Sequence, residues 1–242
     1  MIYAGLSEQG LRNRNEDCIY LPQRGEVSLA IIADGMGGHN AGSTASSLAV
    51  ETAVNSVKRG GGLKAEALLR RAAQEANTAV YEHAKAVHEC RGMGTTLVMA
   101  MFFRSSYTAL NIGDSRLYHY KNGDLYQITK DHSYVAEMVT MGLISPEAAR
   151  THPQRNIITS ALGLRDIEKI DVFEQKWNKD DIIMLCSDGL YGSLLNEDME
   201  RVLREETDLQ NACKTLVQIA AYGGSTDNIS VILVKNEEGS AQ

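Results

Sequence analysis

The chain has 242 residues, of which 43% are hydrophobic and 23% charged, so it can bury a sizeable core as one globular domain. It carries 31 acidic against 24 basic residues and no basic cluster, which argues against nucleic acid as a partner.

The first residues predict neither a leader nor a membrane anchor. The start, MIYAGLSEQG, turns polar by Ser7, and the longest apolar run, LVMAMFF, is too short to span a bilayer. The four cysteines form no C-x-x-C pair, which favours reduced, buried thiols over disulfides or structural zinc. We therefore expect a cytoplasmic protein that contacts no membrane, with residues 1–236 as a single domain and 237–242 as a disordered tail.

Short apolar or alternating runs that end in turn residues predict strands. In chain order they are 28–34, 94–102, 107–114, 181–188 and 228–235. The alternating stretch 117–129 turns at Asn122-Gly123, a pair that tolerates the positive φ angles of a two-residue hairpin turn. At least part of the sheet is therefore expected to be antiparallel.

Helical periodicity appears between and after these strands. Two helices are predicted over 43–58 and 64–87, and two more over 197–206 and 209–222, with Asn196 and Asp208 as N-caps. Segment 131–163 contains Ser145-Pro146, a good N-cap and first position for a short helix. We interpret residues 133–156 as a small helical flap; the alternative is an ordinary helical connection of the core.

The glycine-rich stretch IIADGMGGHNAG, residues 31–42, fails as a phosphate loop. The P-loop pattern needs a lysine that is absent here, and the dinucleotide pattern begins at Gly35 and Gly37 but meets Asn40. What remains is a buried strand that ends at Asp34, followed by glycines that permit close backbone approach.

Carboxylates stand at strand ends in five separate segments. They are Glu16 and Asp17, Asp34, Asp114, Asp188 and Asp227. If these ends share one edge, each unneutralised pair at about 4 Å repels by about 4 kcal/mol at an effective dielectric constant of 20. The acids must take up protons or hold cations, and oxygen ligands suit Mg²⁺ or Mn²⁺. The sequence therefore predicts a site for hard divalent ions.

Six motifs stand in the order seen in metal-dependent protein phosphatases of the protein phosphatase 2C family, which the chain resembles. They are RNRNED, ADGMGGH, GMGTT, NIGDSR, LCSDGL and GGSTDNISV, between Arg12 and Val231. The resemblance implies an α+β fold, a four-layer α-β-β-α sandwich of two antiparallel β-sheets flanked by helices, where periodicity alone indicates only a mixed α and β domain. It also implies a monomeric, stand-alone bacterial phosphatase that acts on phosphoserine and phosphothreonine in proteins and opposes a serine/threonine kinase.

The resemblance further implies a site with two or three Mn²⁺ or Mg²⁺ ions. Asp34 would bridge two ions, the Gly35 carbonyl would bind one of them, and Asp188 and Asp227 would hold the other. Around this centre stand Asp17 and Glu16, the latter through water, and Asp114, which with Asp188 matches a weaker third site. Arg12 matches the arginine that grips the substrate phosphate, since a guanidinium binds phosphate oxygens in a bidentate fork.

The chemistry follows from such a centre. Two ions share a water, lower its pKa and orient the resulting hydroxide for in-line attack on phosphorus, so Asp34 and Asp188 are catalytic as well as metal ligands. The leaving alkoxide needs a proton donor. Eukaryotic members have a histidine two residues after the bridging aspartate, whereas this chain has Met36. The candidates are His39, which is equally compatible with a structural turn, a metal-bound water and, more weakly, His152.

Three alternatives are weighed against this function. Cys18 and Arg24 satisfy C-x5-R, the spacing of cysteine-dependent tyrosine phosphatases, but the residues between them are bulky strand formers and a proline rather than a cradle of amides. A catalytically silent pseudophosphatase, a binding or signalling module on the same fold, should lack some of the metal acids, and none of the principal ones is missing. The third alternative is a phosphatase restricted to sigma-factor regulatory proteins.

Overall fold

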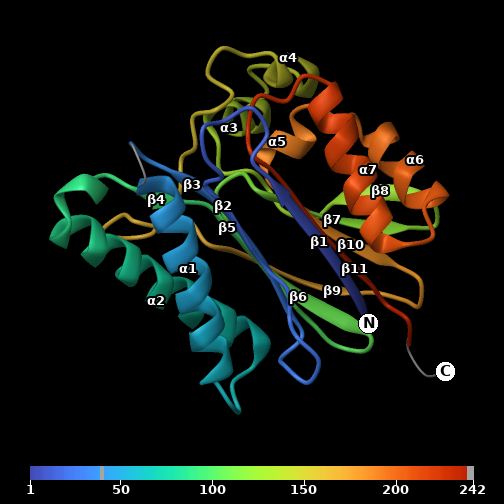
Figure 1. The fold of residues 1–242 in the computed structure, drawn as a ribbon, viewed down its shortest axis with the longest axis horizontal. Coiled ribbons are helices and arrows are strands. Elements are labelled where there is room, and N and C mark those ends of the chain that lie inside the picture. Colours follow the sequence, from blue (N-terminus) through green and yellow to red (C-terminus); the bar gives the residue numbers. More distant parts are fainter. Residues whose placement is uncertain (39–40, 239–242) are drawn as a thin grey trace.

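The computed structural model of the chain describes residues 1–38 and 41–238. In this part of the chain two antiparallel β-sheets pack face to face, and helices cover their outer faces (Figure 1). The first sheet has five strands among the described residues, in the order β1-β11-β10-β7-β8. They are β1 (Ile2–Glu8), β7 (Arg116–Lys121), β8 (Asp124–Gln127), β10 (Ile182–Cys186) and β11 (Ile229–Lys235).

The second sheet has the order β2-β3-β5-β6-β9, with the short β4 beside β3. Its strands are β2 (Asp17–Tyr20), β3 (Leu29–Met36), β4 (Gly94–Thr95), β5 (Leu97–Phe102), β6 (Ser106–Ile112) and β9 (Asp171–Lys176). In β3, Ile31 packs toward the helices and Ile32 toward the other sheet. Both faces of β3 are buried, which explains why its sequence is a continuous apolar run instead of an alternating one.

Helices form the two outer layers and one end of the molecule. α1 (Ala41–Lys58) and α2 (Ala65–Ala86) cover the second sheet, and the short η1 (His88–Cys90) follows them. α5 (Asp188–Tyr191), α6 (Asn196–Glu205) and α7 (Leu209–Tyr222) cover the first sheet. α3 (Tyr134–Thr140) and α4 (Pro146–Arg150) lie at one end of the sandwich (Figure 1). Residues of both helices and of α5 line a cavity there. None of the helices described is long and apolar enough to cross a membrane.

Three separate hydrophobic cores hold the layers together. The central core joins the two sheets and contains the fully buried Trp177, Ile32 and Leu185. One outer core contains Leu69 of α2, and the other contains Leu216 of α7. Each fully buried large side chain contributes roughly 1.5–3 kcal/mol of hydrophobic stabilisation. This arrangement confirms the predicted four-layer α-β-β-α sandwich.

Local turn and cap signals are largely confirmed. Asn122 and Gly123 adopt φ angles of 55° and 95° between β7 and β8. Ser145 caps α4 by accepting a hydrogen bond from the backbone nitrogen of Ala148 at 3.2 Å, and Asp208 caps α7.

One predicted helix cap is wrong, and two strands lie outside the predicted elements. Asn196 is not an N-cap but the first residue of α6; Leu195 precedes the helix, and its N–H donates to Asp198 at 3.4 Å. Strands β1 and β9 were not predicted, because both are edge strands with weak alternation, and their pairing partners decide their conformation. Residues 239–242 of the predicted disordered tail lie outside the described residues.

Candidate metal centre

Five aspartates from five segments gather at one end of the sandwich. Asp17 begins β2 directly opposite Asp34 in β3, Asp188 follows β10, Asp114 follows β6, and Asp227 lies two residues before β11. Because neighbouring strands run antiparallel, the end of one strand meets the start of the next at the same edge. The topology thus brings together residues whose sequence positions only mark strand ends.

Burial and mutual repulsion raise the pKa of four of these carboxyl groups. Burial, with a smaller contribution from neighbouring carboxylates, raises the pKa of Asp17 to about 7, of Asp114 to about 8 and of Asp188 to about 6. The pKa of Asp34 is raised well above its ordinary value by burial and then by the charges of the other four. Burial and mutual repulsion therefore both oppose the ionisation of these carboxyl groups, so the site favours binding of protons or cations.

The hydrogen-bond partners of the aspartates leave specific oxygen atoms unused. Asp17 Oδ2 accepts hydrogen bonds from Ser187 Oγ at 2.8 Å and Ser230 Oγ at 2.6 Å. Arg12 Nη2 donates to Asp227 Oδ2 at 2.7 Å. By contrast, Oδ1 of Asp17 and Oδ1 of Asp188 are buried without a hydrogen-bond partner. A buried carboxylate oxygen without a partner is costly, and a cation is its natural complement.

These residues fit hard divalent ions by chemistry, although their side chains do not converge on a single point. Within residues 1–38 and 41–238, no three Asp, Glu, His or Cys side chains are arranged around one point like the ligands of a formed metal site. One reason is the Arg12–Asp227 ion pair, which occupies an oxygen of Asp227. The unpartnered oxygens, the raised pKa values and the all-oxygen donor set nevertheless match Mg²⁺ or Mn²⁺.

The glycines allow three backbone segments to meet beside Asp34. A Cβ atom on Gly35 would lie 2.0 Å from the Gly42 carbonyl oxygen and 2.8 Å from that of Glu16. A Cβ atom on Gly42 would lie 2.5 Å from Oε1 of Glu16 and 2.9 Å from the backbone oxygen of Gly35. Real Cβ atoms do not approach this closely, so both positions require glycine. The glycine-rich segment therefore packs strand β3, the start of α1 and the residue before β2 together.

Sequence reasoning missed the residues that hold the acids in place. Thr96 Oγ1 accepts a hydrogen bond from the Asp34 backbone nitrogen at 2.9 Å, and Asn228 Oδ1 accepts one from the Glu16 backbone nitrogen at 2.8 Å. Ser187 and Ser230 bind Asp17. All four residues lie inside the quoted motifs. Their place in the motifs was the sequence signal that could have identified them.

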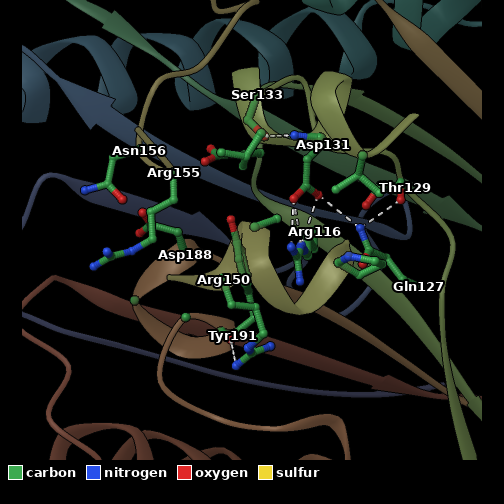
Figure 2. Close-up of a pocket in the computed structure, with 18 of the residues that line it drawn as sticks. Arg116, Gln127, Thr129, Asp131, Ser133, Arg150, Arg155, Asn156, Asp188 and Tyr191 are labelled. Atoms are coloured by element: carbon green, nitrogen blue, oxygen red, sulfur yellow. Dashed lines mark hydrogen bonds and ion pairs between the residues drawn. The ribbon is translucent and has the colours of Figure 1, made fainter. Parts of the chain in front are cut away.

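A cavity of about 690 Å³ opens over this end of the sandwich. Arg12, Asp114, Asp188 and Asp227 line it, together with residues of α3 and α4, whereas Asp17 and Asp34 do not. Figure 2 shows Asp188 on the same side as Arg155 and Asn156, with the Arg116–Asp131 ion pair on the other side. The cavity gives a ligand access to one face of the carboxylate cluster.

The structure does not place a candidate proton donor in the cavity among the described residues. His39 lies outside the described residues. His152 is not among the residues that line the cavity, and its Nδ1 accepts a hydrogen bond from the Gln154 backbone nitrogen at 3.1 Å, so it stabilises the turn after α4. Met36 ends β3 and is 37% exposed.

The geometry contradicts the cysteine-phosphatase alternative. Cys18 lies within strand β2 rather than at a helix N-terminus, and burial raises the pKa of its thiol. A protonated thiol in a strand lacks the amide cradle and the low pKa that such chemistry needs. All four cysteines are free thiols, as predicted.

Comparisons with known proteins agree with this architecture. The family model described as Protein phosphatase 2C matches residues 5–221. The serine/threonine phosphatase stp of Listeria monocytogenes serovar 1/2a is 36% identical over 232 residues, which are 94% of this chain and 92% of that relative. The crystal structure of the Mycobacterium tuberculosis serine/threonine phosphatase PstP/Ppp matches with a TM-score of 0.89 and 35% identity over 98% of both chains. The catalytic domain of PstP in complex with two manganese ions matches with a TM-score of 0.87 and 32% identity over 97% of both chains.

Proposed function

The chain belongs to the protein phosphatase 2C family, and we propose how its own residues carry out the reaction of that family. It is a metal-dependent serine/threonine phosphatase that acts on phosphoproteins. The observation that carries the assignment of the site is the convergence of five aspartates and Arg12 at one end of the sandwich. A silent binding module is disfavoured, because the similar proteins are named phosphatases and every principal acid is present.

The proposed ligands are the carboxylates at this end of the sandwich and the carbonyl of Gly35. Asp34 and the Gly35 carbonyl would hold one ion, and Asp188 and Asp227, with Asp34 as the bridge, would hold a second. Asp17 and Glu16 would complete the surroundings of the pair, Glu16 through water, and Asp114 with Asp188 would hold a third, weaker ion. The buried, unpartnered Oδ1 atoms of Asp17 and Asp188 support this set. The relative solved with two manganese ions supports Mn²⁺ over Mg²⁺.

Arg12 is the proposed phosphate-binding residue. Its side chain is 55% exposed, lines the cavity and bonds Asp227. That ion pair must open before Asp227 binds an ion, and opening frees the planar guanidinium for two phosphate oxygens. Divalent ions held by the aspartates would supply Lewis acidity and lower the pKa of a bound water toward neutral. His39, in the same glycine segment as Asp34, is the proposed donor to the leaving alkoxide.

The biological setting is a proposal as well. Phosphoserine and phosphothreonine in proteins are made by serine/threonine kinases, so we propose that the enzyme opposes such a kinase. One chain supplies all the carboxylates and Arg12, which supports a monomer with residues 1–236 as one catalytic domain and 133–156 as its flap. Four free cysteines support a reducing compartment, the cytoplasm.

Hydrolysis of p-nitrophenyl phosphate and of a phosphothreonine peptide tests the proposed function. With Mn²⁺ both substrates should be turned over, and EDTA should lower the rate at least about 100-fold, because the ions supply several kcal/mol of transition-state stabilisation. A phosphotyrosine peptide serves as the control substrate. Turnover that survives EDTA, or a folded Mn²⁺-loaded protein that leaves the phosphothreonine peptide intact, would refute the proposal.

Replacing Arg12 should separate phosphate binding from ion binding. We expect Arg12→Ala to lower kcat/KM for the phosphothreonine peptide by about 10- to 100-fold, since a hydrogen bond to a charged group contributes about 1.5–3 kcal/mol. Mn²⁺ binding, measured by calorimetry, should not weaken, because the substitution frees Asp227. Arg14→Ala, a nearby exposed arginine outside the cavity lining, is the matched control. Weaker Mn²⁺ binding in Arg12→Ala would contradict the assigned role.

A further inference from the structure

His132 is a buried histidine that the proposed reaction does not use. It lies between β8 and α3, and its side chain is 0% exposed. Both ring nitrogens face polar partners: Nδ1 is 3.2 Å from the backbone nitrogen of Gly113, and Nε2 is 3.3 Å from Oδ2 of Asp171. His132 therefore connects the turn after β6 with the start of β9.

These two contacts determine the tautomer of the ring. A backbone N–H only donates, so Nδ1 must offer its lone pair to Gly113. The ring proton then resides on Nε2 and is donated to the carboxylate of Asp171. Because Nδ1 accepts a hydrogen bond, the ring is neutral, and burial lowers the pKa of His132 in the same direction. Asp171 thus selects the tautomer that accepts from Gly113, as carboxylates do for histidines that must hold one orientation.

The backbone of His132 strengthens the same connection. Its N–H donates to the Gly113 carbonyl oxygen at 2.9 Å, and its own carbonyl oxygen accepts from the Thr159 nitrogen at 2.8 Å. Asn111 Nδ2 also donates to the Gly113 carbonyl oxygen, at 3.0 Å. The turn at Gly113 and the segment that carries α3 and α4 are therefore joined at His132.

The turn that His132 holds carries Asp114. Gly113 has a φ angle of 102°, and a Cβ atom there would lie 2.7 Å from Cγ2 of Thr96, so the turn is pressed against Thr96 on its other side. Thr96 Oγ1 in turn lies 2.7 Å from Ser115 Oγ and accepts from the Asp34 nitrogen. Asp114, buried between these contacts, lines the cavity.

We propose that His132 is a positioning residue for catalysis: its Nε2–H tautomer, set by Asp171, holds the Gly113 amide and thereby fixes the Asp114 carboxylate relative to Asp188. The proposal deepens the proposed function, on which it rests. A displacement of about 1 Å in a catalytic group can cost about 100-fold in rate, so a second contact on this turn has a direct functional consequence. His132 itself touches neither substrate nor ion.

Two substitutions at position 132 separate positioning from packing. His132→Leu removes the acceptor for Gly113 but keeps an apolar side chain, and we expect kcat with Mn²⁺ to fall about tenfold with little change in KM. His132→Asn places a carbonyl oxygen near the position of Nδ1, and we expect it to restore kcat to within about twofold of the wild type. Equal kcat values for the two variants would overturn the proposal.

His119 provides the matched control. It is also a buried histidine, its Nε2 is 3.0 Å from Asp181 Oδ2, and it faces Tyr107, but Asp181 lies at the opposite end of β10 from Asp188. His119→Leu should destabilise the fold comparably and leave kcat of the folded protein within about twofold of the wild type. A loss of kcat equal to that of His132→Leu would indicate general destabilisation and overturn the proposal.

Two readouts do not depend on turnover. NMR of the labelled ring nitrogens should show His132 as the Nε2–H tautomer, and Asp171→Asn, which keeps an acceptor, should preserve it while Asp171→Leu does not. Calorimetry should show the weakest Mn²⁺ site weakened about tenfold by His132→Leu and unchanged by His119→Leu. An Nδ1–H tautomer or unchanged Mn²⁺ affinity would overturn the inference. An inactive wild type would refute the proposed function instead, and these two readouts would still decide the inference.

Discussion

Asp34→Asn is expected to lower kcat for p-nitrophenyl phosphate by about 10³-fold, because a neutral amide would be a poor ligand for the divalent ions that we propose Asp34 holds, and several kcal/mol of transition-state stabilisation would be lost. The same substitution should stabilise the metal-free protein. Asp34 is held among four other aspartates, and its pKa is raised well above the ordinary value, so its charge opposes folding. The variant should therefore be inactive and yet unfold at a higher temperature in EDTA.

The two effects are measured by steady-state kinetics with Mn²⁺ and by thermal unfolding in EDTA. For a chain of this length, 1 kcal/mol corresponds to a shift of about 2–4 °C in Tm. Asp166→Asn, at an exposed position away from the cavity, is the control and should change neither quantity. Substantial turnover by the Asp34→Asn protein would contradict the proposed role of Asp34 in catalysis. A lower Tm in EDTA would show that Asp34 stabilises the fold.

The metal-free protein is expected to lose stability as pH rises from about 4 to about 8, and Mn²⁺ should reverse this trend. The pKa values of Asp188, Asp17 and Asp114 are about 6, 7 and 8 in the folded chain, against an ordinary value of 3.8. Between these limits the native state binds more protons than the unfolded state, so the free energy of unfolding falls as pH increases. A single shift of the size found for Asp17, from 3.8 to about 7, corresponds to about 4 kcal/mol.

Urea unfolding at several pH values, in EDTA and in excess Mn²⁺, measures this dependence. Ions displace the protons from the carboxyl groups, so the stabilisation by Mn²⁺ should be larger at about pH 8 than at about pH 6. In the Asp34→Asn protein the pH dependence in EDTA should be weaker, because the other acids lose one repelling neighbour. A metal-free stability that rises with pH through this window would contradict the raised pKa values.

Local features of the fold could be predicted because they depend on neighbouring residues. The Asn122-Gly123 turn and the Ser145 cap follow from the backbone preferences of those residues. The apolar run before Asp34 marked a buried strand correctly. Asn196 shows the limit of such signals: Leu195 occupies the cap position because Asp198 satisfies its N–H, an interaction that a residue-type preference does not capture.

The candidate site was predictable only in part. The carboxylates at strand ends were visible, and their order matched a known family, but nothing local stated that they meet. Thr96, Ser187 and Ser230 were missed, since a hydroxyl that bonds a distant aspartate has no sequence pattern of its own. His132 was missed for the same reason, because its partners Gly113 and Asp171 come from two other strands' ends.

By itself the sequence determined the core strands, the Asn122-Gly123 turn and the longer helices, and which strand ends carry carboxylates, because these properties arise from a few adjacent residues. Only the tertiary structure decided that Arg12 contacts Asp227, 215 residues away, and that Asp17 stands opposite Asp34. Contacts of this kind depend on strand order and register, which are chosen by the burial of three hydrophobic cores at once. Burial of these cores brings the carboxyl groups together although they repel one another. The raised pKa of Asp34 reflects both its burial and this repulsion.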